Sequence, residues 1–215
     1  MASDLRTSAP LLGEPLPVDF MNTIWADRAG VHDALSTDAE VWGWLHATQP
    51  RLAPSDAAVE HWLQVGTPTD LSDAGDRLRR LRDALRRLAA EQTADPRPAA
   101  ASAIPMAVEA LDVLNQTAAA APGWSSVEGT ATHMTRTRST DASPATAVAA
   151  LLAEQAIDLF TGEIRGELRA CLAPGCVLYF VRHHPRREWC STACGNRARA
   201  ARHYERHRTD RAHAG

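Results

Sequence analysis

Four cysteines near the end of the chain constrain its fold more than any other feature. Cys171 and Cys176 form one pair, and Cys190 and Cys194 form a second pair after residues 177–189. Pro174-Gly175 inside the first pair favours a tight turn, which would direct two thiolates at one point. In a chain kept in a reducing compartment, this clustering indicates a metal site before it indicates disulfides.

Zinc is the metal that best suits four thiolates. Zn²⁺ takes tetrahedral sulfur ligands, and four protein ligands leave no position for a reacting water, so we expect a structural ion. Two alternatives stay open, namely substitution of a cysteine by His183 or His184 and a pair of disulfides. No apolar leader follows the N-terminus, so we expect a cytoplasmic protein, which disfavours disulfides. A finger of about fifty residues should need its metal to fold.

The residues around the cysteines predict a treble-clef zinc finger over 165–215. Residues 177–181 are β-prone, and we expect the order knuckle, hairpin, helix. Ser191 is a good N-cap for a helix running to about His207. Cys190 and Cys194 would then lie at the positive end of the helix dipole, which favours their thiolate forms.

Charge divides the chain into an acidic body and a basic tail. Residues 165–215 hold 11 arginines and four acidic residues (11 − 4 = +7), and residues 1–164 hold 12 arginines and 22 acidic residues (12 − 22 = −10), which together give the net charge of −3. Such a tail is typical of a segment that meets an anion, and nucleic acid is the commonest large anion.

The expected C-terminal helix places Gly195, Arg199, Arg202 and Arg206 on one face. Arginine and asparagine are side chains that contact base edges and phosphates, so double-stranded DNA is the leading partner. The candidate nucleic-acid-binding residues are Asn196, Arg197, Arg199, Arg202, Arg206, Arg186 and Arg187. The alternatives are a solvated helix, a helix docked on the acidic body, and a zinc-stabilised module that binds an acidic protein partner.

Residues 1–164 are predicted to form a mostly helical domain with a small sheet, giving an α+β protein. Thr37 and Glu40 form a capping box, and Ser143-Pro144 begins another helix. We expect a strand near 17–21, helices from 37 to Pro50, from Ser55, and over 72–92, 104–119 and 144–160, a linker over 93–103, and a hairpin turning at Glu128-Gly129. The arginines of 72–92 are expected to face solvent.

Other function classes find little support in the sequence. There is no phosphate-cradling glycine loop, no zincin motif and no nucleophile–base pair, so we expect no enzyme. No apolar run reaches about 18 residues, so we expect no membrane span. The six tryptophans are expected in the core; a pocket lined by some of them for a small-molecule effector stays an alternative.

Residues 189–203 carry a family resemblance. Trp189-Cys190-Ser191-Thr192-Ala193-Cys194-Gly195-Asn196-Arg197, with Ala198-Arg199 and Arg202-His203, resembles the CGNR zinc-finger family. Residues 16–23 (LPVDFMNT) are similar to the opening of the ABATE domain that usually precedes this finger. The resemblance implies a stress-induced transcription regulator with four zinc-ligating cysteines, whose N-terminal domain senses an effector or forms a homodimer, and whose Arg197 either meets DNA or braces the finger. Only three residues separate the second cysteine pair, where many similar members have four, which leaves the helix phase open.

Overall fold

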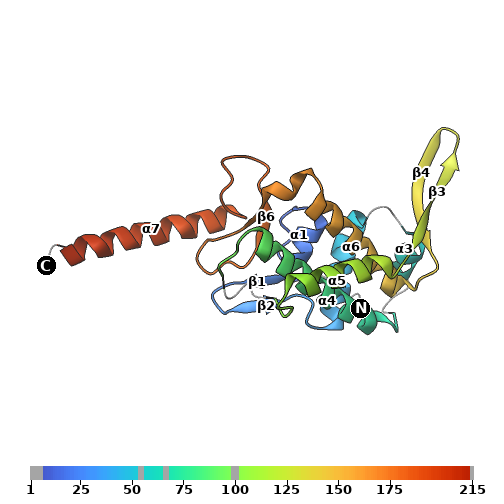
Figure 1. Cartoon of the computed structure of the whole chain (residues 1–215), viewed down its shortest axis with the longest axis horizontal. Coiled ribbons are helices and arrows are strands. Elements are labelled where there is room, and N and C mark those ends of the chain that lie inside the picture. Colours follow the sequence, from blue (N-terminus) through green and yellow to red (C-terminus); the bar gives the residue numbers. More distant parts are fainter. Residues whose placement is uncertain (1–6, 53–55, 65–67, 98–101, 214–215) are drawn as a thin grey trace.

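The computed structural model describes residues 7–52, 56–64, 68–97 and 102–213. The helices are α1 (Leu16–Met21), α2 (Asp38–Thr48), α3 (Ala57–Gln64), α4 (Leu71–Gln92), α5 (Ala107–Ala119), α6 (Pro144–Thr161) and α7 (Thr192–His213), with 3-10 turns η1 (Gln49–Arg51) and η3 (Glu163–Glu167). The strands are β1 (Ile24–Ala26), β2 (Val31–Asp33), β3 (Gly123–Thr130), β4 (His133–Thr140), β5 (Leu168–Ala170) and β6 (Tyr179–Val181). The helices α1–α6 pack into a body, from which the β3–β4 hairpin and α7 project (Figure 1).

Three antiparallel strand pairs, β1–β2, β3–β4 and β5–β6, complete an α+β fold, as the sequence predicted. The β5–β6 pair flanks the first cysteine pair, with Arg169 opposite Phe180. We expected a hairpin after the knuckle, but residues 182–191 form no strand and lead directly into α7. The treble-clef assignment therefore stays a prediction.

The core of the body lies where α1, α4 and α6 meet. Leucines at helical spacing on α4 (Leu78, Leu81 and Leu85) are fully buried, as expected for the apolar seam of an amphipathic helix. The facing helix α6 buries a run of small residues, Ala147, Ala149, Ala150 and Ala153. Small side chains let neighbouring helix backbones approach closely, so these contacts form a dense core.

The helix N-caps predicted from the sequence for α2 and α6 are confirmed. Thr37 Oγ1 accepts the backbone N–H of Glu40, and the Glu40 carboxylate accepts the Thr37 N–H at 3.0 Å, which completes the capping box of α2. Ser143 caps α6 by accepting the N–H of Thr146. Two backbone N–H groups that would otherwise lack partners are thus satisfied at the start of α2, and one is satisfied at the start of α6.

The strand expected near residues 17–21 is instead the helix α1. All six of its residues are buried, and a short apolar run buried on every side has no period that distinguishes a strand from a helix. Pro17 lies in the first turn, where its missing N–H and fixed φ suit a helix. The prediction of a strand was therefore wrong.

The turn of the β3–β4 hairpin lies three residues further along than predicted. Thr130 pairs with His133, so the chain reverses at residues 131–132 and Gly129 stays within the strand opposite Met134. Gly129 has a φ of +113°, and a Cβ there would lie 2.0 Å from the carbonyl oxygen of His133. The glycine thus relieves a close approach inside the strand rather than forming the turn.

The arginines of α4 do not all face solvent. Arg82 and Arg86 are only 3% and 2% exposed, which corrects the expectation of a solvated basic face. Arg82 pairs with Asp33 at 2.5 Å and with Asp83 at 3.2 Å. Arg86 reaches two backbone carbonyls, described below. None of the described helices is both long and apolar enough to cross a membrane.

Candidate metal centre and basic helix

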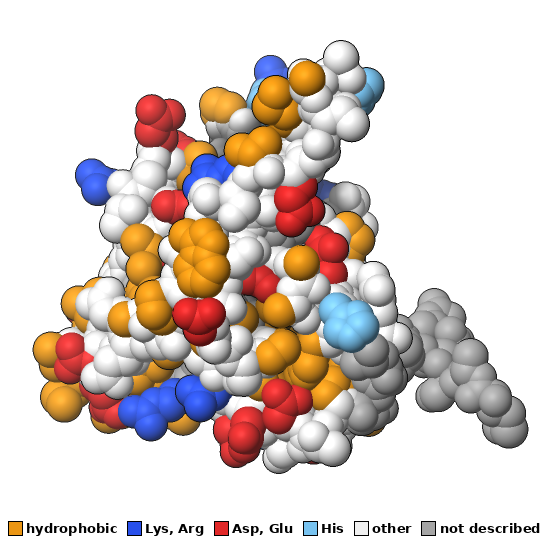
Figure 2. Space-filling view, turned by 90° about the vertical axis from the view of Figure 1, so that its right-hand side faces the viewer, with side chains coloured by type: hydrophobic (Ala, Val, Ile, Leu, Met, Phe, Trp, Pro, Cys, Tyr) orange, Lys and Arg blue, Asp and Glu red, His pale blue; other side chains and the backbone are white. Residues whose placement is uncertain are grey.

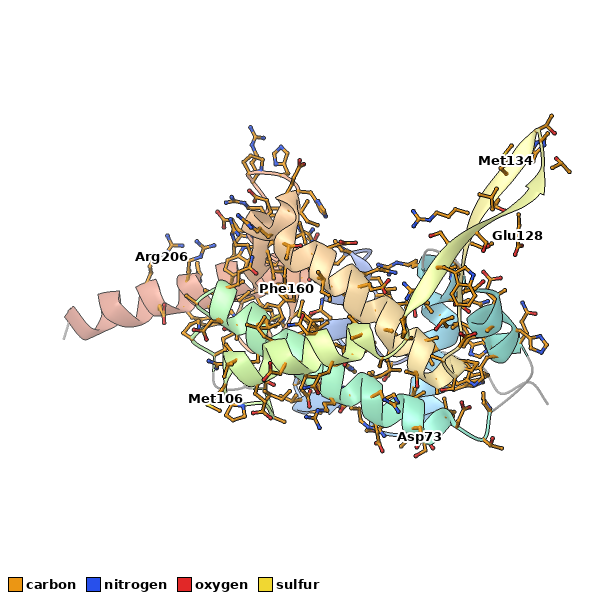
Figure 3. All side chains as sticks on the ribbon, turned by 45° about the vertical axis from the view of Figure 1, so that its right-hand side comes forward. Asp73, Met106, Glu128, Met134, Phe160 and Arg206 are labelled. Atoms are coloured by element: carbon orange, nitrogen blue, oxygen red, sulfur yellow. The ribbon has the colours of Figure 1, made fainter. Side chains whose placement is uncertain are left out.

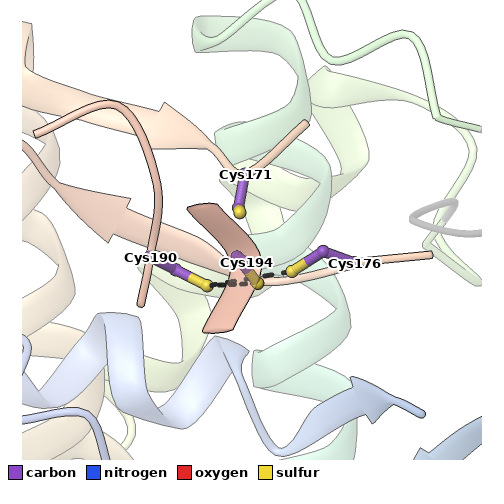
Figure 4. Close-up of side chains that lie close together, drawn as sticks. All are labelled: Cys171, Cys176, Cys190 and Cys194. Carbon is purple, nitrogen blue, oxygen red and sulfur yellow. Dashed lines mark hydrogen bonds between the residues drawn. The ribbon is translucent and has the colours of Figure 1, made fainter. Parts of the chain in front are cut away.

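The structure brings the four cysteines together at one buried point (Figure 4). All four sulfurs lie within 4.8 Å of one another. Cys190 Sγ lies 3.8 Å from Cys176 Sγ and 3.4 Å from Cys194 Sγ. Sulfurs bound tetrahedrally to zinc at about 2.3 Å lie about 3.8 Å apart. The donor set and its spacing therefore fit Zn²⁺.

Local backbone geometry aims each pair of sulfurs. In the knuckle, residues 171–176, the Cys171 N–H donates to Leu178 O and the Cys176 N–H donates to Ala173 O, both at 2.9 Å. Gly175 closes this turn with a φ of +72°, a conformation that glycine adopts without strain. At the start of α7, Ser191 Oγ accepts the Cys194 N–H at 3.3 Å, so the cap residue fixes the fourth sulfur.

The electrostatics of the cluster call for a cation. Hydrogen bonds from the thiols of Cys176 and Cys190 lower the pKa of Cys171 to about 2, and donation to Cys171 raises the pKa of Cys176 to about 12. Without a cation, one thiolate is therefore stabilised by neighbours that keep their protons. For all four cysteines to lose their protons together, a metal ion must compensate their charge.

Arg197 braces the cluster from the outside. Its Nη2 lies 3.0 Å from Cys194 Sγ, and this hydrogen bond raises the pKa of the guanidinium. Of the two roles that the sequence left open for Arg197, contact with DNA or support of the finger, the structure shows the supporting contact.

Arg97 connects the knuckle to the loop that follows α4. Its Nη1 donates to the carbonyl oxygens of Cys171 at 2.8 Å, Cys176 at 2.9 Å and Leu178 at 3.3 Å. Its Nε and Nη2 bind the two oxygens of Asp95 at 2.7 and 2.6 Å, and Asp95 also accepts the Tyr179 hydroxyl at 2.9 Å. One guanidinium thus satisfies three knuckle carbonyls and one buried carboxylate.

A second connection joins α1 and α4 to the segment after the knuckle. The Asn22 side chain donates to Tyr179 O at 2.9 Å and accepts the Tyr179 N–H at 2.8 Å, as a neighbouring strand would. Arg86 donates to Met21 O at 2.9 Å and Val177 O at 3.3 Å. Burial lowers the pKa of Arg86 to about 10, so the guanidinium stays charged at neutral pH.

Arg187, a predicted phosphate contact, is engaged within the fold. It forms an ion pair with buried Glu14 and donates to Val181 O at 2.9 Å and Cys190 O at 3.0 Å. Its guanidinium also lies over the ring of Phe180. These contacts hold the loop that presents Cys190, and the phosphate contact predicted for Arg187 stays a prediction.

The other candidate DNA contacts are exposed. Arg186 lies in the loop before α7, and the helix exposes Asn196, Arg199, Arg202 and Arg206. Arg199 donates to Asn196 Oδ1, and Arg202 Nε makes a long contact of 3.4 Å with Ala198 O. Cys194 and Ala198 are buried in the first turns of the helix. Gly195 is buried as well, because Trp189 lies over it, so it does not share the open face predicted for it.

Two surface cavities border the centre. One, of about 410 Å³, lies between the loop and α7 and is lined by Arg186, Glu188, Trp189, Ser191, Gly195 and Arg199, among others. The other, of about 530 Å³, lies between the β1–β2 hairpin and the knuckle. Trp189 is the one tryptophan among the residues that line these two cavities. Trp42, Trp44 and Trp62 are buried in the core, as expected, whereas Trp124 on β3 is 53% exposed, which corrects the expectation for that residue.

Comparison with protein families now gives this arrangement a context. Residues 14–163 match the family model ABATE, described as "Putative stress-induced transcription regulator". The chain belongs to the ABATE family. In this ABATE protein the described cysteine centre falls within a second match, to the CGNR zinc finger, at residues 167–207. A search of curated proteins found no match to the sequence.

The two family matches extend the sequence interpretation without deciding every residue. The resemblance to both families is confirmed, and so is the four-cysteine cluster of a zinc finger. Sequence reasoning missed the arginines that join the ABATE region to the finger, Arg86, Arg97 and Arg187. Each of them also contacts residues distant along the chain, and the sequence does not signal those distant partners.

Proposed function

We propose that this ABATE protein binds double-stranded DNA through α7 and regulates transcription, with a structural zinc ion fixing the helix at its first turn. The supporting observation is the exposure of Arg199, Arg202 and Arg206 on a helix that projects from the body (Figures 1 and 3). None of these three arginines pairs with a carboxylate within the described part of the chain. Exposed arginines held on a rigid helix are suited to bidentate phosphate contacts.

Zinc in this proposal is a structural ion and the protein is not an enzyme. Four sulfurs fill a tetrahedral shell, so water or substrate has no free coordination position. Arg197 donates to one of these sulfurs and Arg97 to the knuckle carbonyls, and such hydrogen bonds hold the ligands in orientation around the ion. The ion would thereby fix the direction in which α7 leaves the body.

We place one backbone phosphate in the 410 Å³ cavity at the start of α7. Arg186 and Arg199 both line it, and both are exposed. Arg199 already contacts Asn196, so the amide orients the guanidinium beside the cavity. Glu188 also lines this cavity, and its charge would favour a position for the phosphate on the arginine side.

The salt dependence of binding tests the proposal. We expect the affinity of the full chain for a duplex of about 20 base pairs to fall steeply with salt, because neutralised phosphates release counterions. Arg199→Ala, Arg202→Ala and Arg206→Ala should each reduce the slope of log K against log salt by about one unit. Fluorescence anisotropy across a salt series measures both quantities.

A matched control separates local contacts from net charge. Arg80→Ala removes one exposed arginine from α4, and it should leave the slope unchanged. Absence of binding at low salt, or equal slopes in the wild type and all three α7 variants, contradicts the proposal. Binding to polyglutamate without binding to DNA would instead favour the alternative in which the helix meets an acidic protein partner.

A further inference from the structure

The β3–β4 hairpin is an arm that projects from the body without a covering element (Figures 1 and 3). Val127 and Met134 are 69% and 66% exposed on it, and hydrophobic side chains lie along the arm in Figure 2. A two-stranded hairpin is at best marginally stable in water unless another surface packs against it. Two large apolar residues on such an arm indicate a surface that is covered in the working state.

One face of the arm combines these apolar residues with an arginine. Val127 pairs with Arg136 and Gly129 pairs with Met134, so Val127, Met134 and Arg136 point to the same side of the hairpin. Arg136 donates to Ser125 Oγ at 2.7 and 3.0 Å. Within the described residues it has no carboxylate partner. The arm therefore presents an apolar strip with one unneutralised positive charge.

The outer face of α5 presents the complementary pattern. Val108 and Leu111 are 61% and 47% exposed, and Asp112 is exposed beside them at helical spacing. No ion pair to Asp112 is formed by any residue that the structure describes. Met106, at the start of α5, extends the apolar patch.

The lengths of the two surfaces are similar, but the arm lies too far from α5 of the same chain to pack on it. Strands of eight residues span about 26 Å, and the 13 residues of α5 span about 20 Å. In Figure 3, Met134 near the arm tip and Met106 of α5 lie on opposite sides of the molecule. The arm of a second copy is therefore the partner that fits.

We propose that two copies of this chain exchange arms, so that the β3–β4 hairpin of each copy lies on α5 of the other. Val127 and Met134 would cover Val108 and Leu111, and Arg136 would pair with Asp112. The exchange is reciprocal, so two identical contacts close a symmetric dimer with no arm left over. The inference is independent of DNA binding.

Sedimentation of the full chain over a concentration series tests this interface. We expect the wild type to form a dimer, and Met134→Glu to weaken its association at least about tenfold, because a carboxylate would be buried against apolar side chains. Thr130→Glu is the matched control. Thr130 pairs with His133 on the opposite face of the arm, and this change should leave the association constant unaltered.

Charge reversal identifies the facing helix. Arg136→Glu and Asp112→Arg should each weaken the dimer. The double variant should restore it, because the two opposite charges have only changed places and still attract each other. A wild type that stays monomeric at all soluble concentrations overturns the proposal. A dimer unaffected by Met134→Glu, or one that the double charge reversal fails to restore, overturns it as well.

Discussion

Replacing Arg97 with methionine tests whether the body of the protein holds the zinc knuckle in place. The substitution keeps much of the side-chain volume but removes the donors that reach three knuckle carbonyls. It also leaves the fully buried Asp95 side chain without its cationic partner, so that among the contacts described above only the Tyr179 hydroxyl still donates to it. Burial raises the pKa of Asp95, but the hydrogen bonds and charge of Arg97 outweigh this effect, so the pKa lies below its ordinary value.

The expected loss of stability is large because a buried carboxylate would remain uncompensated. Removing one partner of a buried ion pair costs about 3–5 kcal/mol in the free energy of unfolding. In a domain of 150–250 residues, each kcal/mol changes the melting temperature by about 2–4 °C. We therefore expect Arg97→Met to melt about 6–20 °C below the wild type and to release zinc faster to a chromophoric chelator.

Two further variants distinguish this explanation from a general loss of an arginine. Arg77→Met changes an exposed arginine on α4 and should shift the melting temperature by less than about 2 °C, as surface substitutions usually do. Asp95→Asn in the Arg97→Met background removes the uncompensated charge and should recover part of the loss. The reasoning is refuted if Arg97→Met has the melting temperature of the wild type, or if adding Asp95→Asn lowers the melting temperature of Arg97→Met further.

The remaining predictions concern the tyrosine beside this network and the metal itself. Burial raises the pKa of Tyr179 to about 12, so the stability gained from its neutral form is complete below its ordinary pKa of 10 and is lost as pH rises toward 12. A phenolate absorbance titration should show a step near pH 12 that Tyr179→Phe removes, and a wild type without this step contradicts the assignment. Cys176→Ser should lower the zinc content measured by mass spectrometry from one equivalent and reduce the melting temperature, because a hydroxyl is a poor substitute for a thiolate ligand; full zinc content would exclude Cys176 as a ligand.

The features that sequence predicted correctly depend on neighbours along the chain. The capping box of Thr37 and Glu40 needs only three residues of separation, and the same holds for the Ser143 cap. The cysteine pairs likewise have a spacing that a turn and a helix start can satisfy locally. For such features the residue types and their separation already contain the required geometry.

The predictions that were wrong concern arginines whose surroundings depend on residues distant along the chain. Arg86 and Arg80 are both arginines of α4, yet one is buried and the other exposed. In its buried position Arg86 donates a hydrogen bond to the carbonyl of Val177, 91 positions further along the chain. Arg187 is the neighbour of Arg186 in the sequence. Glu14, 173 positions away from Arg187, forms its ion pair with Arg187 and not with Arg186. Helical periodicity and charge pattern contain no information about such partners.

The same long-range contacts change how the two family regions relate to each other. Charge and composition divide the chain near residue 164, but the apolar cores do not follow that division. Leu168, Tyr179 and Val181 belong to the core of the body.

In the other direction, Leu12 and Trp25 of the N-terminal region pack against the cluster that contains the four cysteines. The knuckle is therefore held by contacts with the body as well as by the cysteine cluster, and Cys190 and Cys194 lie where α7 starts. Because α7 is attached to the body through these residues and the Arg187–Glu14 pair, its direction depends on the metal centre and on the packing of the ABATE region together. A change at either would reorient the exposed arginines, which gives the N-terminal region a physical route to the surface proposed to meet DNA.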